Sequence, residues 1–299
     1  MGQTIACANQ KGGVGKTTTV VNLATYLALA GERVLLIDLD PQGNATSGLG
    51  ISRHSTSRSV YDGLIDGVEL RDLLAPTQIP NLTIVPSSLA LAGAEIELTP
   101  LDQRERQLRR LVSPVTESFD YVLIDCPPAL GLLTLNALTA AQSVLIPLQA
   151  EYYALEGLTQ LVATLELVRD NLNPTLSLKG VVLTMYDART NLSADVAGEV
   201  RRHLGGAVFS TIIPRSVRLS EAPSYGLPIA LYRPTSPGAE AYRALADEIR
   251  RRDRNGATAS HAGEDRPDSD SLHPTLAPPA SAATVQAPGP TADIAVAGR

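Results

Sequence analysis

The stretch Lys11-Gly-Gly-Val-Gly-Lys16-Thr17-Thr18 decides the fold of this 299-residue chain. It follows a short apolar run at residues 4–8 and precedes a helical pattern at residues 16–29. Three glycines allow backbone N–H groups to wrap around a phosphate chain, and the start of a helix adds a favourable dipole. In such a loop Lys16 reaches the terminal phosphates and the Thr17 hydroxyl binds Mg²⁺. The sequence therefore predicts a phosphate-binding loop between a strand and a helix.

The loop departs from the standard P-loop pattern GxxxxGK[ST] at its first position. Gln10 stands where that pattern has glycine, and Lys11 adds a second lysine near the start of the loop. Of the 25 basic residues only three are lysines, and the third, Lys179, precedes a strand-like run and has no assigned role. The chain thus keeps lysine, a compact point charge, in the loop and uses the planar guanidinium of arginine almost everywhere else.

Apolar runs and helical patterns alternate along most of the chain. Strand-like runs lie at residues 4–8, 33–38, 82–85, 121–124, 143–147 and 180–184, and helical patterns at 16–29, 155–169, 192–204 and 237–251. Continuously apolar strands that alternate with helices are typical of a buried parallel sheet. We therefore expect an α/β fold with a mostly parallel, twisted sheet and helices on both faces. Its ligands should sit at the carboxyl ends of the strands.

Composition separates a folded body from a tail. Residues 253–299 hold eleven alanines and six prolines, and they contain no aromatic residue. Such a segment buries too little apolar surface to offset the entropy of the chain. We expect one P-loop domain over residues 1–252 and a disordered, Ala/Pro-rich tail over residues 253–299.

Several classes of protein are excluded. No run of 18 apolar residues is present, so no transmembrane helix is expected. Residues 1–9 lack the charged segment and the long apolar segment of a secretory signal. Two cysteines, Cys7 and Cys126, cannot form a disulfide framework or a four-cysteine metal site, and we expect both to be buried. These features predict a cytoplasmic protein.

Carboxylates follow two of the strand-like runs. Asp38 ends the run at 33–38, and Asp40 comes next in a turn that contains proline and glycine. The run at 121–124 leads into Asp125, as in a Walker B strand that brings one carboxylate to a metal ion. A carboxylate near the phosphates can bind Mg²⁺ or orient a water molecule. The metal site is therefore predicted to comprise Thr17, Asp40 and Asp125.

With these residues the chain resembles the ParA/MinD group of ATPases, whose deviant Walker A motif reads KGGVGKTT as it does here. The resemblance implies that ATP and Mg²⁺ are the cofactors and that the nucleotide is bound by Lys11, Gly12, Gly13, Val14, Gly15, Lys16, Thr17 and Thr18. It also implies a homodimer that sandwiches ATP, in which Lys11 contacts the phosphates of the partner. Lys11, Lys16 and Asp40 are the implied catalytic residues, with Asp40 orienting the attacking water and Asp38 as a weaker candidate.

Three further segments are similar to the ParA/Soj chromosome- and plasmid-partitioning ATPases. They read IDLDPQGNATSGLG at residues 37–50, VLTMYDARTNLS at 182–193 and IIPRSVRLSEAPSYGLPI at 212–229. The resemblance spans about residues 3–250. It implies that Pro214 lies near the adenine, together with Met185 and Ser216.

Charge is unevenly distributed along the chain. Residues 186–252 carry a net charge of +3, whereas residues 1–185 carry −6 and the tail carries −3. A basic region can bind nucleic-acid phosphates without reading the base sequence. The resemblance implies nonspecific DNA contacts by Arg189 and Arg218. Secondary candidates for such contacts are Arg201, Arg202, Arg215, Arg250, Arg251 and Arg252.

Together these features predict a DNA-partitioning ATPase that is cytoplasmic and associated with the nucleoid. By resemblance, its ATP-bound dimer binds double-stranded DNA nonspecifically and a ParB-like centromere-binding protein stimulates hydrolysis. The alternative is a MinD-like positioning ATPase, but the acidic, Ala/Pro-rich C-terminus is unlike an amphipathic membrane helix. A reductase like the nitrogenase iron protein would need two exposed cysteines at a dimer interface, whereas Cys7 lies within the first strand-like run and Cys126 has no second ligand at a suitable spacing. A scaffold protein would not need the loop, Asp40 and Asp125 together.

Overall fold

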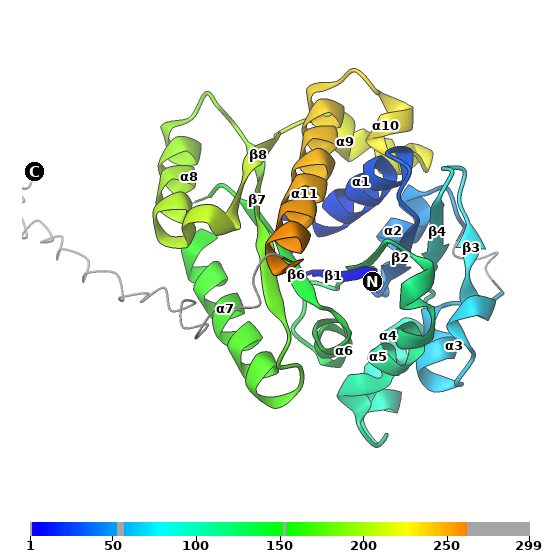
Figure 1. Ribbon diagram of the computed structural model, residues 1–299. Coiled ribbons are helices and arrows are strands. Elements are labelled where there is room, and N and C mark those ends of the chain that lie inside the picture. The colour runs from blue at the N-terminus through cyan, green and yellow to red at the C-terminus, as the bar shows by residue number, and fades with distance from the viewer. Residues whose placement is uncertain (1, 53–56, 152–153, 262–299) are drawn as a thin grey trace, which may run out of the picture.

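The computed structural model describes residues 2–52, 57–151 and 154–261, and its centre is an eight-stranded sheet (Figure 1). The strand order is β3-β4-β2-β5-β1-β6-β7-β8, and every pairing is parallel except that of β3 with β4. The strands are β1 (Gln3–Cys7), β2 (Val34–Asp38), β3 (Ala75–Pro76), β4 (Leu82–Val85), β5 (Tyr121–Asp125), β6 (Ser143–Gln149), β7 (Ser177–Tyr186) and β8 (Val208–Pro214).

Helices cover both faces of this sheet (Figure 1). The α-helices are α1 (Lys16–Leu29), α2 (Asn44–Gly48), α3 (Val60–Ile65), α4 (Leu91–Leu98), α5 (Gln107–Val112), α6 (Leu132–Ala140), α7 (Ala154–Asn171), α8 (Asn191–Leu204), α9 (Val217–Glu221), α10 (Ile229–Tyr232) and α11 (Pro237–His261). Short 3₁₀ turns lie at Leu70–Leu73, Arg104–Arg106, Ser113–Ser118, Gly205–Ala207 and Ala222–Tyr225.

Two hydrophobic clusters lie on opposite faces of the sheet. Along β2, Leu35 and Ile37 join the cluster that includes α3 to α8, whereas Val34 and Leu36 join the cluster beneath α1 and α11. Successive side chains of a strand point to opposite faces, so a strand covered on both faces must be apolar throughout. The predicted α/β class, the mostly parallel sheet and its coverage by helices are confirmed.

Most of the predicted elements are present, with ends shifted by a few residues. The sequence analysis does not predict β8, because Ser210 and Thr211 interrupt its apolar character at the edge of the sheet. It also omits β3 and the short helices between β2 and β6. Cys7 and Cys126 are free and buried, as expected, and burial raises the pKa of both thiols.

The last helix runs past the predicted end of the body. α11 continues to His261, past the boundary predicted after residue 252. Just beyond that boundary Asp253 forms an ion pair with Lys179 and accepts a hydrogen bond of 2.8 Å from the Tyr121 hydroxyl. Lys179, which has no role in the sequence analysis, therefore anchors α11. The rest of the predicted tail, residues 262–299, lies outside the described residues.

These contacts form an amino-edge cluster of Tyr121, Lys179 and Asp253, close to the starts of β5 and β7. Beside it the Arg250 guanidinium donates to Glu32 at 2.7 Å. α11 thus ends at the edge of the sheet opposite the carboxyl ends of the parallel strands.

Candidate functional site

The glycine-rich loop connects the end of β1 to the start of α1. Gly13 and Gly15 have φ values of 77° and 88°, a left-handed conformation that glycine adopts at little cost. Gly12 and Gly13 are exposed, whereas Lys16 is only 7% exposed and its Nζ donates to the carbonyl oxygen of Lys11 at 3.4 Å. The loop therefore has the position between strand and helix that the sequence predicts, with one lysine folded into it.

Lys11, the first lysine of the loop, has its side-chain partner outside the loop. Its Nζ forms an ion pair of 2.7 Å with Glu151, just beyond the end of β6, and both side chains are nearly half exposed. Its backbone N–H donates to Asn9, whose side-chain amide donates to the carbonyl oxygen of Pro147 at 2.7 Å. Asn9 thus ties the start of the loop to β6. Sequence reasoning missed Asn9 and Glu151, because Glu151 lies 140 residues away along the chain.

Asp125 is the most unusual side chain of the site. It is fully buried, and within the described part of the chain neither of its carboxylate oxygens has a hydrogen-bond partner. Burial raises its pKa well above the ordinary value and the charge of Asp38 adds to this, whereas a weak interaction with the Thr17 side chain and the charge of Lys16 lower it. A buried carboxylate without a partner is costly, and a divalent cation would satisfy it. Asp125 and Thr17 therefore fit the predicted magnesium site.

Asp38 has a different environment, although it is also fully buried. Its Oδ2 accepts hydrogen bonds from the backbone N–H and the hydroxyl of Thr46, at 2.7 and 2.6 Å. Burial raises the pKa of Asp38 to about 6, and the hydrogen bonds from Thr46 counter part of this effect. Asp38 therefore holds α2 in place. Its place as the weaker candidate for orienting water stays a prediction.

Asp40 lies on the loop between β2 and α2 and is 7% exposed. Its Oδ1 accepts a hydrogen bond of 2.9 Å from the backbone N–H of Gln42. The backbone N–H of Asp40 donates to Asp38 at 3.3 Å. Since Asp40 follows the carboxyl end of β2, it lies at the same edge of the sheet as the glycine-rich loop and Asp125. Its roles in binding metal and orienting water stay predictions.

A cavity of about 230 Å³ lies next to the loop. Its lining includes Gly15, Thr18, Met185, Pro214 and Ser216, so the three residues assigned to the adenine by resemblance come together beside the loop. Sequence reasoning missed two further residues of this region. Tyr242 of α11 lines the cavity, and the Thr184 hydroxyl donates to the carbonyl oxygen of Val14 at 2.8 Å.

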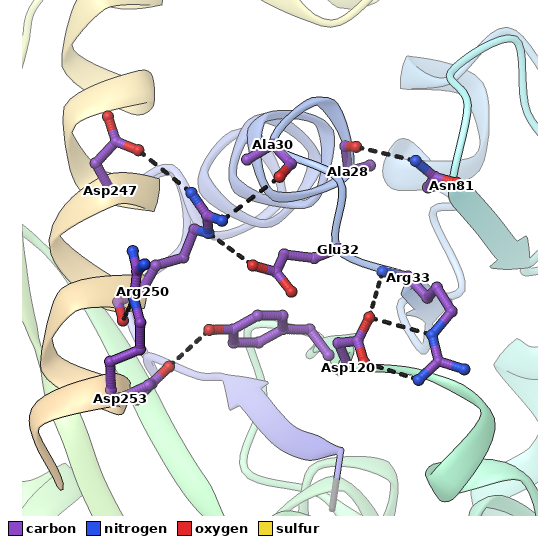
Figure 2. Close-up of polar contacts among 11 residues, drawn as sticks. Ala28, Ala30, Glu32, Arg33, Asn81, Asp120, Asp247, Arg250 and Asp253 are labelled. Carbon is purple, nitrogen blue, oxygen red and sulfur yellow. Dashed lines mark hydrogen bonds and ion pairs between the residues drawn. The ribbon is translucent and has the colours of Figure 1, made fainter. Parts of the chain in front are cut away.

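A larger cavity, of about 420 Å³, lies far from this chemistry, around the amino-edge cluster. Its charged side chains pair with one another, as in the ion pairs of Arg33 with Asp120 and of Arg250 with Glu32 (Figure 2). Lying at the wrong edge of the sheet for the loop, it is not the nucleotide site, and the smaller cavity beside Gly15 is the better candidate.

Arg189 and Arg218 follow the carboxyl ends of β7 and β8, which are neighbours in the sheet. Arg189 is 87% exposed and donates two hydrogen bonds to Asp187, at 2.9 and 2.7 Å. Arg218 donates to Glu221 at 2.8 Å. Each arginine lowers the pKa of the carboxyl group it contacts, through these hydrogen bonds. Both predicted DNA-binding side chains thus reach the surface.

Two of the secondary arginine candidates have structural partners instead. Arg250 pairs with Glu32, and Arg252 pairs with Glu248 at 2.8 Å while its guanidinium lies 4.2 Å from the centre of the Phe209 ring. These contacts hold α11 against the body. Exposed candidates that remain are Arg201, Arg202, Arg215 and Arg251.

Comparison with known proteins decides the family. A family described as an AAA domain matches residues 2–178. The sporulation initiation inhibitor protein Soj of Bacillus subtilis is 57% identical over 249 residues, which cover 83% of this chain and 98% of Soj. The chromosome partitioning protein ParA of Myxococcus xanthus is 53% identical over 253 residues, 85% of this chain and 89% of ParA. The chain belongs to the ParA/Soj family of partitioning ATPases.

Solved structures support the same fold. A Mycobacterium smegmatis protein described as cobyrinic acid a,c-diamide synthase, crystallised with ADP and magnesium, is 41% identical and has a TM-score of 0.76, with 86% of this chain and 97% of that chain covered. The cell division ATPase MinD of Pyrococcus furiosus is 27% identical and has a TM-score of 0.71, with 84% and 99% covered. The resemblance to the ParA/MinD group is therefore confirmed, and a bound nucleotide with magnesium in a relative supports ATP and Mg²⁺ as cofactors of this family member.

Membrane association was the alternative considered for this ParA/Soj family member. Among the residues that the structure describes, no helix has both the length and the apolar character to cross a membrane.

Proposed function

We propose that this ParA/Soj family member is an ATP-dependent DNA-partitioning ATPase. Its ATP-bound homodimer binds double-stranded DNA nonspecifically, and a ParB-like centromere-binding protein stimulates hydrolysis. The observation that carries the ATPase assignment is the fully buried carboxylate of Asp125, which lies next to Thr17 and Lys16 and has no well-formed hydrogen bond within the described residues. A carboxylate in that state is suited to a cation bound with a phosphate chain.

The residues of the loop take separate roles in this proposal. The backbone of residues 11–18 binds the phosphates of ATP, and Lys16 stabilises their negative charge from within the same subunit. Thr17 and Asp125 hold the magnesium ion, with Asp40 close to it, and the ion neutralises charge on the phosphates when bound. Asp40 orients the water that attacks the terminal phosphate. Met185, Pro214 and Ser216 surround the adenine.

Lys11 acts across the dimer. Its side chain is nearly half exposed, and so is that of Glu151, its ion-pair partner. An exposed ion pair is weakly held, because water and salt screen it. Lys11 can therefore leave Glu151 and contact the phosphates in a second subunit at small cost.

DNA contact is proposed for the arginines beyond the ends of β7 and β8. Arg189 and Arg218 bind backbone phosphates, and the exposed Arg201, Arg202, Arg215 and Arg251 extend the basic region. Such contacts carry no sequence specificity and weaken as salt concentration rises. The protein would then reside in the cytoplasm on the nucleoid. A MinD-like role at a membrane is the competing outcome.

One experiment distinguishes these outcomes. Purified protein is mixed with ATP and Mg²⁺, or with ADP and Mg²⁺, and binding is measured to a DNA fragment of arbitrary sequence and to anionic liposomes. We expect binding to DNA only with ATP, with an affinity that falls as salt is added. Addition of a ParB-like protein should then increase phosphate release. Binding to liposomes alone would favour the MinD-like role, and binding to neither would contradict the DNA proposal.

A further inference from the structure

The loop that carries Asp40 is held in place from a third strand. Ser87 follows the carboxyl end of β4, which pairs with β2. Its hydroxyl donates a hydrogen bond of 2.7 Å to the backbone carbonyl oxygen of Asp40, 47 residues earlier in the chain. Ser87 has no exposed surface. The buried side chain of Ser87 therefore forms a hydrogen bond with the main chain of Asp40, the residue proposed to orient water.

The same serine also contacts α2. Its backbone N–H donates to the Thr46 hydroxyl at 3.0 Å, and that hydroxyl donates to Asp38 at 2.6 Å. Thr46 is fully buried, so water does not compete for either of these hydrogen bonds. The Ser87 hydroxyl donates to Asp40, the Ser87 backbone N–H donates to Thr46, and the Thr46 hydroxyl donates to the Asp38 carboxylate. Such a chain of buried bonds allows one arrangement of its members.

We propose that Ser87 and Thr46 are positioning residues for Asp40. They hold the backbone from β2 to α2 so that the Asp40 carboxylate stays where water must be oriented. This inference rests on the proposed function, because it assigns a task to Asp40. It adds two residues, neither of which faces the nucleotide cavity beside Gly15 or belongs to the phosphate loop.

Loss of this support should affect turnover more than binding. ATP affinity depends on the loop at residues 11–18 and on the cavity beside Gly15, which Ser87 does not line. The position of a water-orienting carboxylate matters mainly in the transition state, where a misplacement of about 1 Å lowers the rate on the order of 100-fold. A purely structural role would instead weaken folding and nucleotide binding together.

The main test is Ser87→Ala, compared with Ser47→Ala. Ser47 lies one residue after Thr46 on α2, and its hydroxyl donates to the Gly43 carbonyl oxygen at 3.0 Å, outside the chain of bonds through Ser87. For Ser87→Ala we expect kcat to fall roughly 10- to 100-fold. The ATP dissociation constant and the ATP-dependent dimer should stay within about twofold of wild type. Ser47→Ala should keep the wild-type kcat.

A second pair of variants separates the hydroxyl of Thr46 from its volume. Thr46→Ser keeps the hydroxyl and should retain most of the activity, whereas Thr46→Val loses it and should behave as Ser87→Ala does. Equal kcat for Ser87→Ala and wild type would overturn the proposal. So would a loss of ATP binding that matches the loss of kcat, since the role would then be structural.

Asp40→Ala distinguishes this inference from the proposed function. If Asp40→Ala abolishes hydrolysis and Ser87→Ala does not reduce it, only the positioning role fails. If Asp40→Ala leaves hydrolysis unchanged, the proposed role of Asp40 fails first, and the positioning role fails with it.

Discussion

Asp38 and Asp125 are direct register partners at the ends of the neighbouring parallel strands β2 and β5, and both side chains are fully buried. Neighbouring strands lie about 4.8 Å apart, so two carboxylates are held side by side without water. The Asp38 carboxylate is already hydrogen-bonded, because it accepts two hydrogen bonds from Thr46. Asp125 has no such partner in the described chain. Asp38 thus holds α2, and Asp125 is the member of the pair that the proposed function assigns to the magnesium ion.

Asp125→Asn should abolish the additional stabilisation against unfolding that magnesium gives in the presence of ATP. We expect the variant to fold in the presence of EDTA, because a buried charge and its repulsion with Asp38 are removed. Magnesium should then no longer add to the stabilisation given by ATP, which in wild type reaches about 2.7 kcal/mol at 100 times the dissociation constant. Thermal unfolding with ATP, with and without Mg²⁺, measures this.

A matched control for Asp125→Asn is Asp120→Asn, which lies just before the other end of the same strand and pairs with Arg33. This control should keep the wild-type response to magnesium. An undiminished response in Asp125→Asn would remove Asp125 from the metal site.

Alanine substitutions of the two loop lysines should impair different steps, ATP binding for Lys16 and dimer formation for Lys11. Lys16→Ala should lose ATP binding, because the proposed function has the buried ammonium bind the phosphates of its own subunit. Lys11→Ala removes only an exposed ion pair with Glu151, so its stability should change by less than about 1 kcal/mol. We expect it to bind ATP as a monomer and to form no dimer, as measured by light scattering. An ATP-dependent dimer of Lys11→Ala would contradict the contact across subunits.

Arginine at each lysine position keeps the charge and changes its shape. Lys11→Arg and Lys16→Arg should show the same two defects more weakly, because a planar guanidinium replaces a compact ammonium.

Replacing Arg189 and Arg218 by alanine should weaken DNA binding and leave ATP hydrolysis intact. If each contacts one phosphate, the slope of log affinity against log salt should fall by roughly 2. The control is the double variant of Arg58 and Arg71, two exposed arginines that are also in surface ion pairs. Unchanged affinity at matched salt would show that the DNA surface lies elsewhere.

Glu248 should make stability depend on pH. Burial alone would raise its pKa, but hydrogen bonds from Ser210 and Thr211 outweigh this and lower the pKa to about 2. The ionised form is therefore favoured by folding. Its contribution is present above the unfolded pKa, near 4.5, and is lost as pH falls toward 2.

The variant that tests this is Glu248→Gln, which should unfold more easily at pH 7, by about 2 kcal/mol. The difference from wild type in urea unfolding should shrink between pH 4.5 and pH 3. A difference independent of pH would mean that the charge of Glu248 is not what holds β8 to α11.

Two truncations test where the folded body ends. A chain that stops at residue 261 keeps the amino-edge cluster and should be as stable as the full chain. A chain that stops at residue 252 lacks Asp253 and leaves the mostly buried Lys179 without its ion pair, at a cost of about 3 kcal/mol. Asp253→Ala in the full chain should cost a similar amount. Equal stability of the two truncated chains would restore the boundary predicted from composition.

Local patterns predict the centre of the molecule well. The loop at Lys11–Lys16 requires its glycines for the backbone, and the strands beside it are apolar because helices cover both faces. The carboxyl ends of parallel strands lie at one edge of the sheet, so a carboxylate that follows a strand lies at that edge. For this reason the sequence predicts Asp38, Asp40 and Asp125 at one edge of the sheet, where Asp38 and Asp125 are register partners.

Contacts between distant parts of the chain are not visible in local patterns. Ser87 looks like an ordinary turn residue, yet it contacts Asp40, 47 residues away, and Lys179 contacts Asp253, 74 residues away. Composition changes after residue 252, yet α11 continues past it and Asp253 pairs with Lys179.

The buried cysteines have a practical consequence for measurement. Cys7 and Cys126 are inside the molecule and their thiols have raised pKa values, so they react slowly with thiol reagents. Arg254 is exposed on α11, lines the cavity around the amino-edge cluster with Tyr121 and Asp253, and is not among the candidates for DNA contact. A single Arg254→Cys substitution would therefore accept one fluorophore without removal of the native cysteines. That dye could report assembly and DNA release in real time while standing clear of the nucleotide.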